Sequence, residues 1–99
     1  MILHRKQKIK KKTKRFIEFI LTEKELKEYE QRKNDYLYGR FAAKEAIMKL
    51  LRNTKELSFH DIEILTNSNG EPYSNFSNIS ISISHEKNYT IAVALLNDN

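Results

Sequence analysis

The chain has 99 residues, enough for one small domain, and its two glycines and single proline leave no recognisable linker. It contains no cysteine, which excludes disulfides and thiolate metal sites, and its longest apolar run, IAVALL, is too short to cross a bilayer. The basic N-terminus is not followed by the apolar stretch of a secretory signal. We therefore expect one domain over residues 1–99, in the cytoplasm and without membrane contact.

Charge is distributed unevenly along the chain. Residues 1–16 hold eight of the 18 lysines and arginines and no acidic residue, a charge of +8. Residues 17–99 hold the other ten together with all 13 acidic residues, a charge of −3, and the two parts sum to the net +5. We expect residues 1–11 to form a basic arm without regular structure. Such an arm attracts nucleic acid, membranes or acidic proteins, although a plain solubilising tail is an equally good interpretation.

Two helices are predicted after the arm. A short apolar patch comes first: Phe16, Ile17, Ile20 and Leu21. Thr22 followed three residues later by Glu25 matches a capping box, so a helix is expected to begin there and to continue to about residue 33. After a break near residues 34–35, a second helix is expected from about Tyr36 to Arg52.

The hydrophobic period then changes to two. Strand candidates lie at residues 59–65, 78–85 and 89–96, with a turn at NSNG and a short hairpin loop, EKN, between the last two. In the second candidate three isoleucines alternate with three serines, which indicates one buried and one exposed face. The order predicts an α+β fold with two N-terminal helices and a small antiparallel sheet of about three strands.

The second helix carries an unusual set of charges. On a helical wheel Lys44 falls inside the apolar stripe formed by Leu37, Phe41, Met48 and Leu51. Arg40 lies one turn earlier, and Glu45 and Lys49 lie on the flank, four residues apart. A carboxylate among cations suits a phosphate-rich ligand with a divalent metal. The alternatives are a surface ion pair between Glu45 and Lys49, and a Lys44 side chain that reaches the solvent at the edge of the core.

The stretch GRFAAKEAIMK resembles the signature helix of the 4′-phosphopantetheinyl transferases. That signature is an aromatic residue, two residues, Lys-Glu-Ala, and a lysine four positions after the glutamate. Four further stretches, KRFIEFILTEKEL, LSFHDIEIL, NGEPY and ISISHEKNYTIAVAL, resemble the holo-acyl-carrier-protein synthase subfamily in the same order. The resemblance covers roughly residues 12–96.

The resemblance implies transfer of 4′-phosphopantetheine from coenzyme A to a serine of apo acyl carrier protein, with Mg²⁺ at the pyrophosphate. Glu45 matches the metal ligand, and Glu45 and Lys49 match the catalytic pair. The residues expected to bind coenzyme A are Arg40, Lys44, Lys49, Ser84 and His85. The resemblance also implies a homotrimer, a role in fatty-acid biosynthesis, and a basic surface for the carrier protein, formed by Lys12, Lys14, Arg15 and Phe16.

Two departures from the family pattern bear on activity. The family begins with a strand that carries Gly-Ile-Asp, and its aspartate is the second metal ligand. The first aspartate here is Asp35, so we expect that first strand to be missing. The glycine-rich loop after Lys49 is absent as well. The alternatives are a degenerate homologue that binds coenzyme A or carrier protein without catalysis, and a small basic nucleic-acid-binding protein; no specific nucleic-acid-binding module is recognisable.

Overall fold

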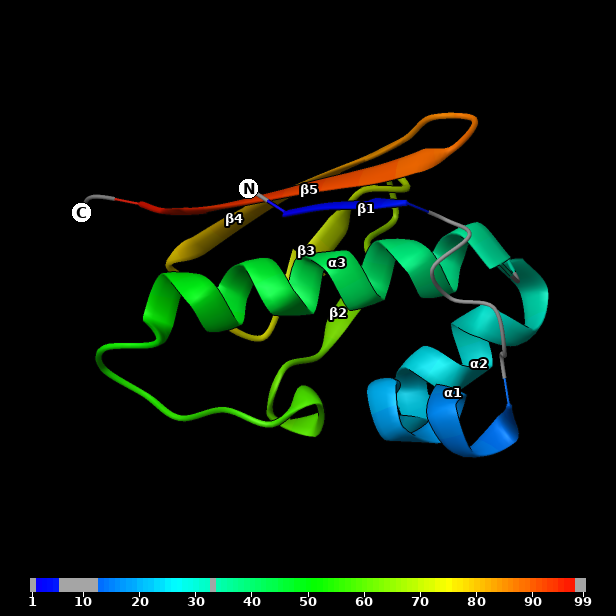
Figure 1. Cartoon of the computed structure of the whole chain (residues 1–99), viewed down its shortest axis with the longest axis horizontal. Helices are drawn as coiled ribbons and strands as arrows, with labels where there is room; N and C mark the ends of the chain where they lie inside the picture. The colour runs from blue at the N-terminus through cyan, green and yellow to red at the C-terminus, as the bar shows by residue number, and fades with distance from the viewer. Residues whose placement is uncertain (1, 6–12, 33, 98–99) are drawn as a thin grey trace.

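The computed structural model describes residues 2–5, 13–32 and 34–97 of the chain. The chain begins with strand β1 (Ile2–Arg5) and three helices, α1 (Lys14–Ile20), α2 (Glu23–Arg32) and α3 (Asn34–Leu51). A short 3-10 helix η2 (Phe59–Asp61) precedes the remaining strands, which are β2 (Ile64–Thr66), β3 (Pro72–Ser74), β4 (Ile79–His85) and β5 (Tyr89–Leu96) (Figure 1). No helix in these described ranges is long and apolar enough to span a membrane.

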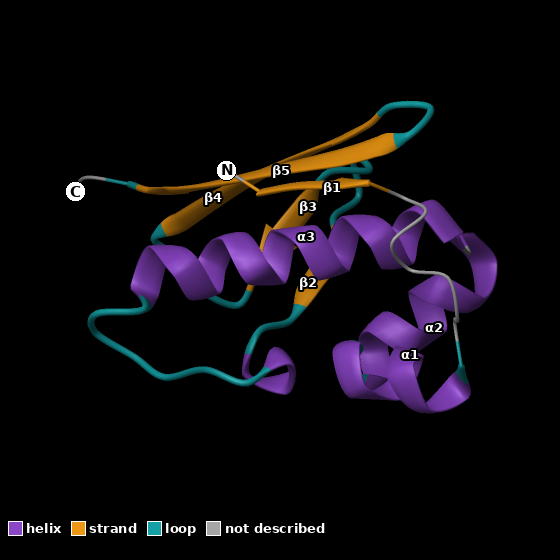
Figure 2. Ribbon diagram, in the orientation of Figure 1, coloured by secondary structure: helices purple, strands orange, loops and turns teal. Residues whose placement is uncertain are grey.

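The strands form two small antiparallel sheets. One sheet has the order β1-β5-β4, and the other is the hairpin β2-β3. Figure 2 shows α3 between the three-stranded sheet on one side and helices α1 and α2 on the other. This position leaves the central helix with little solvent contact, so it can present side chains to both layers.

The core follows from that layered arrangement. Small residues of α3 pack against small residues of β5, which allows a close approach between helix and sheet: Ala42, Ala43, Ala46, Ala92 and Ala94. A second buried cluster joins α3 to the first two helices and consists of Ile20, Leu21, Tyr36 and Leu37. Because α3 is buried on two faces, its buried residues do not all lie on the single apolar stripe that the helical wheel showed.

The predicted α+β class, the helices near residues 22–33 and 36–52, and the final hairpin are confirmed. Strand β4 turns Ile79, Ile81 and Ile83 inward and its serines outward, as the alternation predicted. In β5 the buried residues are Thr90, Ala92 and Ala94, so its larger apolar side chains lie on the outer face.

The expectation that the first strand is missing is wrong. Residues Ile2–Arg5 pair antiparallel with β5, with Ile2 opposite Ala92 and Arg5 opposite Tyr89. An edge strand obtains its hydrogen bonds from the neighbouring backbone, so a basic sequence can occupy it, and charge on an edge also prevents further pairing. The basic arm is therefore not structureless at residues 2–5, and residues 6–12 lie outside the described ranges. The strand contains no acidic residue.

Three other local predictions need correction. The apolar patch after the arm is a helix, α1, capped by Thr13, whose Oγ1 accepts a hydrogen bond from Phe16 N at 3.1 Å. Residues 59–65 are not one strand, because Ser58 and Asp61 form a capping box that starts η2, and β2 begins only at Ile64. Strand β3 directly follows the turn at Gly70, whose φ of 84° favours glycine. Elements of three residues, such as η2, β2 and β3, are too short to show a clear period.

Candidate active site

A pocket of about 290 Å³ opens between the start of α3, the β2-β3 hairpin and the end of β4. Arg40 from α3 and His85 from the end of β4 both line it, so the structure brings together two residues that the resemblance assigned to one ligand. Arg32 at the end of α2 adds a further cation to the wall. Asp35 also lines the pocket, so two arginines face one carboxylate there, and a concave site with this excess of positive charge suits an anionic group such as a phosphate.

Arg40 is held rigidly in this wall. Its Nε donates to the carbonyl oxygen of Ile64 at 2.9 Å, and its Nη2 donates to Thr66 Oγ1 at 2.9 Å. The guanidinium also lies 4.1 Å from the centre of the Tyr36 ring and is only 7% exposed. Because hydrogen bonds and stacking fix the side chain before any ligand arrives, binding an anion requires little reorganisation.

Glu28 on α2 completes the surroundings of Arg40. Its carboxylate accepts hydrogen bonds from Tyr36 Oη at 2.8 Å and from Thr66 N at 3.1 Å, and it lies 3.4 Å from Arg40 Nη2. Burial alone would raise the pKa of Glu28, but these hydrogen bonds and the Arg40 charge outweigh burial and lower it. The pKa of Tyr36 is raised, chiefly by burial. The cluster therefore contains an ionised carboxylate that orients the arginine.

We expect the free energy of unfolding to depend less steeply on pH, in the acidic range, in Glu28→Gln than in the parent protein. In the native chain the pKa of Glu28 lies below its ordinary value of 4.5, so the unfolded chain takes up the proton first as the pH falls. The contribution of the Glu28 carboxylate to the free energy of unfolding is therefore present above pH 4.5, and it is lost as the pH falls through the lower pKa of the folded state. The variant should lose about 1 kcal/mol or less at neutral pH and show a flatter acid limb in urea denaturation. Glu30→Gln, an exposed change on the same helix, is the control and should keep the native slope.

His85 reaches the pocket because residue 39 is a glycine. A Cβ at Gly39 would lie 3.2 Å from the His85 ring and 3.1 Å from Ile83 Cγ2. The ring therefore rests against the backbone of α3, and its Nδ1 lies 3.4 Å from Thr90 Oγ1. Sequence analysis did not single out Gly39, although a glycine inside a helix is a signal of close approach.

Ser84 does not share this pocket. Successive side chains of a strand point to opposite faces, so Ser84 lies on the outer face of β4, opposite Ile91, while His85 faces α3. Within one chain Ser84 and His85 therefore lie on opposite faces of β4, although the resemblance assigns both to coenzyme A.

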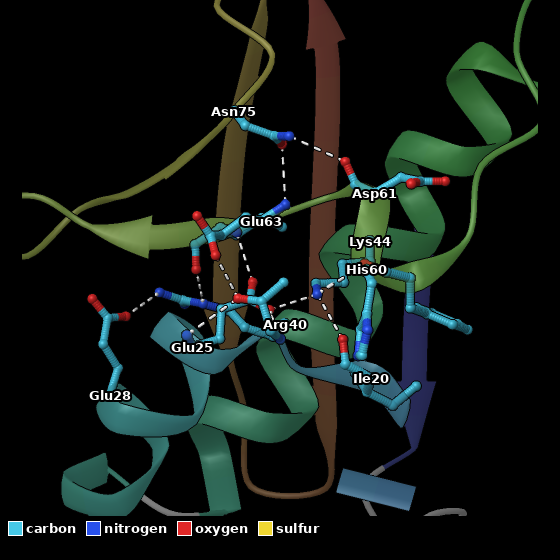
Figure 3. A network of polar contacts seen from close by, with 12 residues as sticks. Ile20, Glu25, Glu28, Arg40, Lys44, His60, Asp61, Glu63 and Asn75 are labelled. Carbon is cyan, nitrogen blue, oxygen red and sulfur yellow. Dashed lines mark hydrogen bonds and ion pairs between the residues drawn. The ribbon is translucent and has the colours of Figure 1, made fainter. Parts of the chain in front are cut away.

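Lys44 lies in the protein interior. Its Nζ donates to the Ile20 carbonyl oxygen at 2.6 Å, to Glu25 Oε1 at 2.6 Å and to the Phe59 carbonyl oxygen at 3.1 Å (Figure 3). Both charged side chains are 0% exposed. Burial lowers the pKa of Lys44, and the Glu25 carboxylate opposes this effect. The ammonium therefore has three protein acceptors, and the geometry does not favour the expected contact between Lys44 and a phosphate.

Glu45 and Lys49 lie farther along α3 than the pocket. Glu45 is half-buried and Lys49 is exposed. Neither lines the Arg40–His85 pocket, so a ligand that contacts all four residues must extend along the helix. No group of three or more histidine, aspartate or glutamate side chains in the described ranges could hold a metal ion. A metal at Glu45 would therefore take most of its ligands from elsewhere.

The expected carrier-protein surface lies on α1. Lys14 and Arg15 are exposed, Phe16 is half-buried with its ring 5.8 Å from Phe41, and Lys12 lies outside the described ranges. Phe19 on the same helix stands where the family often has arginine; it is 64% exposed and packs edge-on against Phe59.

Comparison with known proteins agrees with this architecture. Residues 2–94 match the model of the 4′-phosphopantetheinyl transferase superfamily. The chain is 45% identical over 94 residues to the holo-[acyl-carrier-protein] synthase of Bacillus subtilis, covering 84% of this chain and 78% of the relative. A match to the corresponding synthase of Geobacillus sp. is 41% identical and covers 95% of this chain and 87% of the relative.

Solved structures give the same result. A holo-(acyl-carrier-protein) synthase from Bacillus anthracis in complex with CoA (3′,5′-ADP) superimposes with a TM-score of 0.83 at 35% identity, covering 97% of this chain and 92% of that one. The synthase from Neisseria meningitidis gives a TM-score of 0.85 at 28% identity, with coverage of 99% and 100%. This chain therefore belongs to the 4′-phosphopantetheinyl transferase superfamily, and within it to the holo-[acyl-carrier-protein] synthase type.

Proposed function

We propose that the chain moves 4′-phosphopantetheine from coenzyme A onto a serine of an apo acyl carrier protein, with Mg²⁺. The observation that carries this proposal is the preorganised Arg40–His85 pocket at the start of the signature helix. Two of the similar structures, from Bacillus anthracis and Helicobacter pylori, are complexes with coenzyme A or part of it. We assign the pocket to the 3′-phosphate end of coenzyme A, and titration calorimetry should show tighter binding of coenzyme A than of its 3′-dephospho form.

The remaining phosphate groups are proposed to lie along α3. Lys49 lies nine positions after Arg40 on α3, a rise of about 13 Å at about 1.5 Å per residue. This distance separates the cation assigned to the 3′-phosphate from the cation assigned to the pyrophosphate. Lys49 is exposed and so is available to an incoming anion. In this arrangement Arg40, His85 and Lys49 orient the donor and neutralise its charge, which is most of what a protein contributes to phosphoryl transfer.

Mg²⁺ is the metal that this donor set fits. It prefers six oxygen ligands, keeps several waters, and is commonly held by one or two carboxylates together with substrate phosphates. Glu45 supplies one carboxylate beside the proposed pyrophosphate position, and β1 supplies none. When bound, the ion would neutralise developing charge on phosphate oxygens. We therefore expect weak affinity for Mg²⁺ in the free protein and useful affinity only when coenzyme A is present.

Homotrimer formation is part of the proposal. The outer face of the β4-β5 hairpin carries Ser80, Ser82 and Ser84 opposite Leu95, Val93 and Ile91. Leu95 is 59% exposed, and Val93 and Ile91 are half-buried, so the face combines apolar and small polar side chains. A chain of this size gains stability by covering such a face with further copies of itself. A trimer would also place Ser84 at a subunit interface.

Sedimentation equilibrium tests the assembly. We expect a trimer at micromolar concentration in the parent protein. Val93→Lys should shift the equilibrium toward monomer because it places a charge in the covered face. Lys55→Glu, which changes an exposed residue away from that face, is the control. A parent protein that sediments as a stable, folded monomer at micromolar concentration would contradict the trimer.

The carrier protein is proposed to dock on α1 and the basic segment before it. An acidic helix is attracted by Lys12, Lys14 and Arg15, and this attraction raises the association rate and weakens as the Debye length shortens to about 8 Å at physiological salt. Changing all three residues to glutamate should weaken carrier binding at low salt and reduce its salt dependence, as measured by surface plasmon resonance. Coenzyme A binding should not change.

A control for charge alone is available on the described surface. The triple change Arg52→Glu, Lys55→Glu and Lys87→Glu alters the net charge by the same amount at exposed positions outside α1 and its neighbour α2. Carrier binding by this control should remain near the parent value. If both triple variants weaken binding equally, the attraction is general and α1 is not the docking helix.

A further inference from the structure

The buried pair formed by Lys44 and Glu25 lies where five elements of the fold meet. Lys44 projects from α3 and donates to the last residue of α1, Ile20, and to the first residue of η2, Phe59. Glu25 lies in the first turn of α2. Its Oε1 accepts hydrogen bonds from Lys44 Nζ and from Thr22 N, and its Oε2 accepts one from Ile64 N of β2 at 2.6 Å.

The same contacts continue to the pocket. Ile64 donates its N–H to Glu25 and accepts a hydrogen bond from Arg40 Nε through its carbonyl oxygen. A chain of polar contacts thus runs from the end of α1 through Lys44, Glu25 and the two peptide groups on either side of the Ile64 Cα to the guanidinium in the wall (Figure 3). The structure contains no buried side-chain nitrogen or oxygen without a partner in the described ranges, so this path is fully satisfied.

The two ends of the path are the two places assigned to substrates. Helix α1 carries the proposed carrier-protein contacts, and Arg40 lines the proposed coenzyme A pocket. A transfer reaction between two bound substrates requires the attacking and the departing groups to be aligned to within a fraction of an ångström. A charged, fully hydrogen-bonded junction is stiff, because moving any member leaves a buried charge or peptide group unpaired.

We propose that Lys44 and Glu25 are positioning residues that hold the carrier-docking helix in register with the coenzyme A pocket. This inference rests on the proposed function. It assigns the lysine of the signature helix a role in geometry and not in contact with phosphate. Loss of the pair should reduce kcat more than it reduces the binding of either substrate, since each binding surface persists and only their relative placement changes.

The test uses Lys44→Met combined with Glu25→Gln. This double variant removes both charges together, so no lone charge is left in the interior, and the glutamine oxygen can still accept from Thr22 N. Ser74→Ala is the control, because it removes two part-buried hydrogen bonds to Phe76 outside the path and reports the effect of destabilisation alone. Circular dichroism at low temperature selects conditions in which all proteins are folded.

We expect kcat of the double variant to fall by about tenfold or more, with the Kd values for coenzyme A and for carrier protein within about threefold of the parent. The control should keep the parent kcat. A folded double variant with the parent kcat would overturn the positioning role.

A second measurement does not depend on turnover. The chain has no cysteine, so Glu18→Cys on α1 and Arg52→Cys just after α3 provide two unique spin-label sites at exposed positions. With the labelled chain diluted into an excess of unlabelled chain, so that distances between copies do not contribute, pulsed electron paramagnetic resonance should give one narrow distance distribution in the labelled parent and the Ser74→Ala control, and a shifted or broader distribution in the labelled double variant. Identical distributions would overturn the inference. If the parent protein shows no transfer at all, the proposed function fails, and this distance measurement still decides whether the pair holds the helix.

Discussion

Replacing Glu45 with glutamine should abolish transfer of 4′-phosphopantetheine. Glutamine has nearly the same shape, so the fold should persist, but a neutral amide is a poor ligand for Mg²⁺ and does not balance its charge. Because β1 contributes no acidic residue, Glu45 is the carboxylate that we propose as the metal ligand. We expect kcat to fall by at least about a hundredfold, a typical effect of removing one group that stabilises transition-state charge.

Two controls distinguish an effect of Glu45→Gln on metal binding from an effect on folding. Glu56→Gln changes an exposed carboxylate outside α3 and should retain the parent rate. Thermal unfolding of Glu45→Gln should match that of the parent protein. Unchanged turnover in Glu45→Gln would remove Glu45 from the reaction and, with it, the proposed metal position.

Replacing Lys44 alone should have the largest effect on stability. In Lys44→Met the methionine fills most of the space of the lysine, but the Glu25 carboxylate remains buried without its counterion, and the carbonyl oxygens of Ile20 and Phe59 lose their donor. Removal of one partner of a buried pair costs about 3–5 kcal/mol, because the remaining charge is uncompensated. Urea denaturation monitored by circular dichroism measures this loss directly.

Lys49→Met is the matched control for this prediction, since it makes the same change at an exposed position on the same helix. Its free energy of unfolding should lie within about 0.5 kcal/mol of the parent value, as for most surface substitutions. A Lys44→Met protein as stable as the control would show that Lys44 does not hold the junction of the helices.

Local sequence signals were sufficient to predict α2 and the β4-β5 hairpin. The capping box at Thr22 and Glu25 predicted the start of α2, and both of its hydrogen bonds are present, at 2.9 Å and 3.3 Å. The Ile-Ser alternation predicted the two faces of β4, and the three-residue loop predicted its pairing with β5. These features depend on residues a few positions apart, so one sequence is enough to show them.

The missed features depend on residues that are distant in the chain. Strand β1 forms because β5 offers hydrogen bonds 84 to 90 positions later, and its own basic sequence gives no strand signal. Glu25 looked like an ordinary cap on a polar helix, whereas it is also the counterion of Lys44, 19 residues away. The wheel showed that Lys44 was out of place in an apolar stripe, but only the fold shows which acceptors surround it.

The central claim is that this chain modifies a carrier protein with coenzyme A as donor. The direct measurement is incubation of the purified protein with coenzyme A, Mg²⁺ and apo acyl carrier protein, followed by intact-protein mass spectrometry. A sample without coenzyme A and a carrier protein whose acceptor serine is changed to alanine are the controls. We expect the carrier to gain the mass of one 4′-phosphopantetheine group in the complete reaction and in neither control. A carrier of unchanged mass, under conditions in which coenzyme A demonstrably binds, would contradict the account and favour a homologue that binds coenzyme A without catalysis.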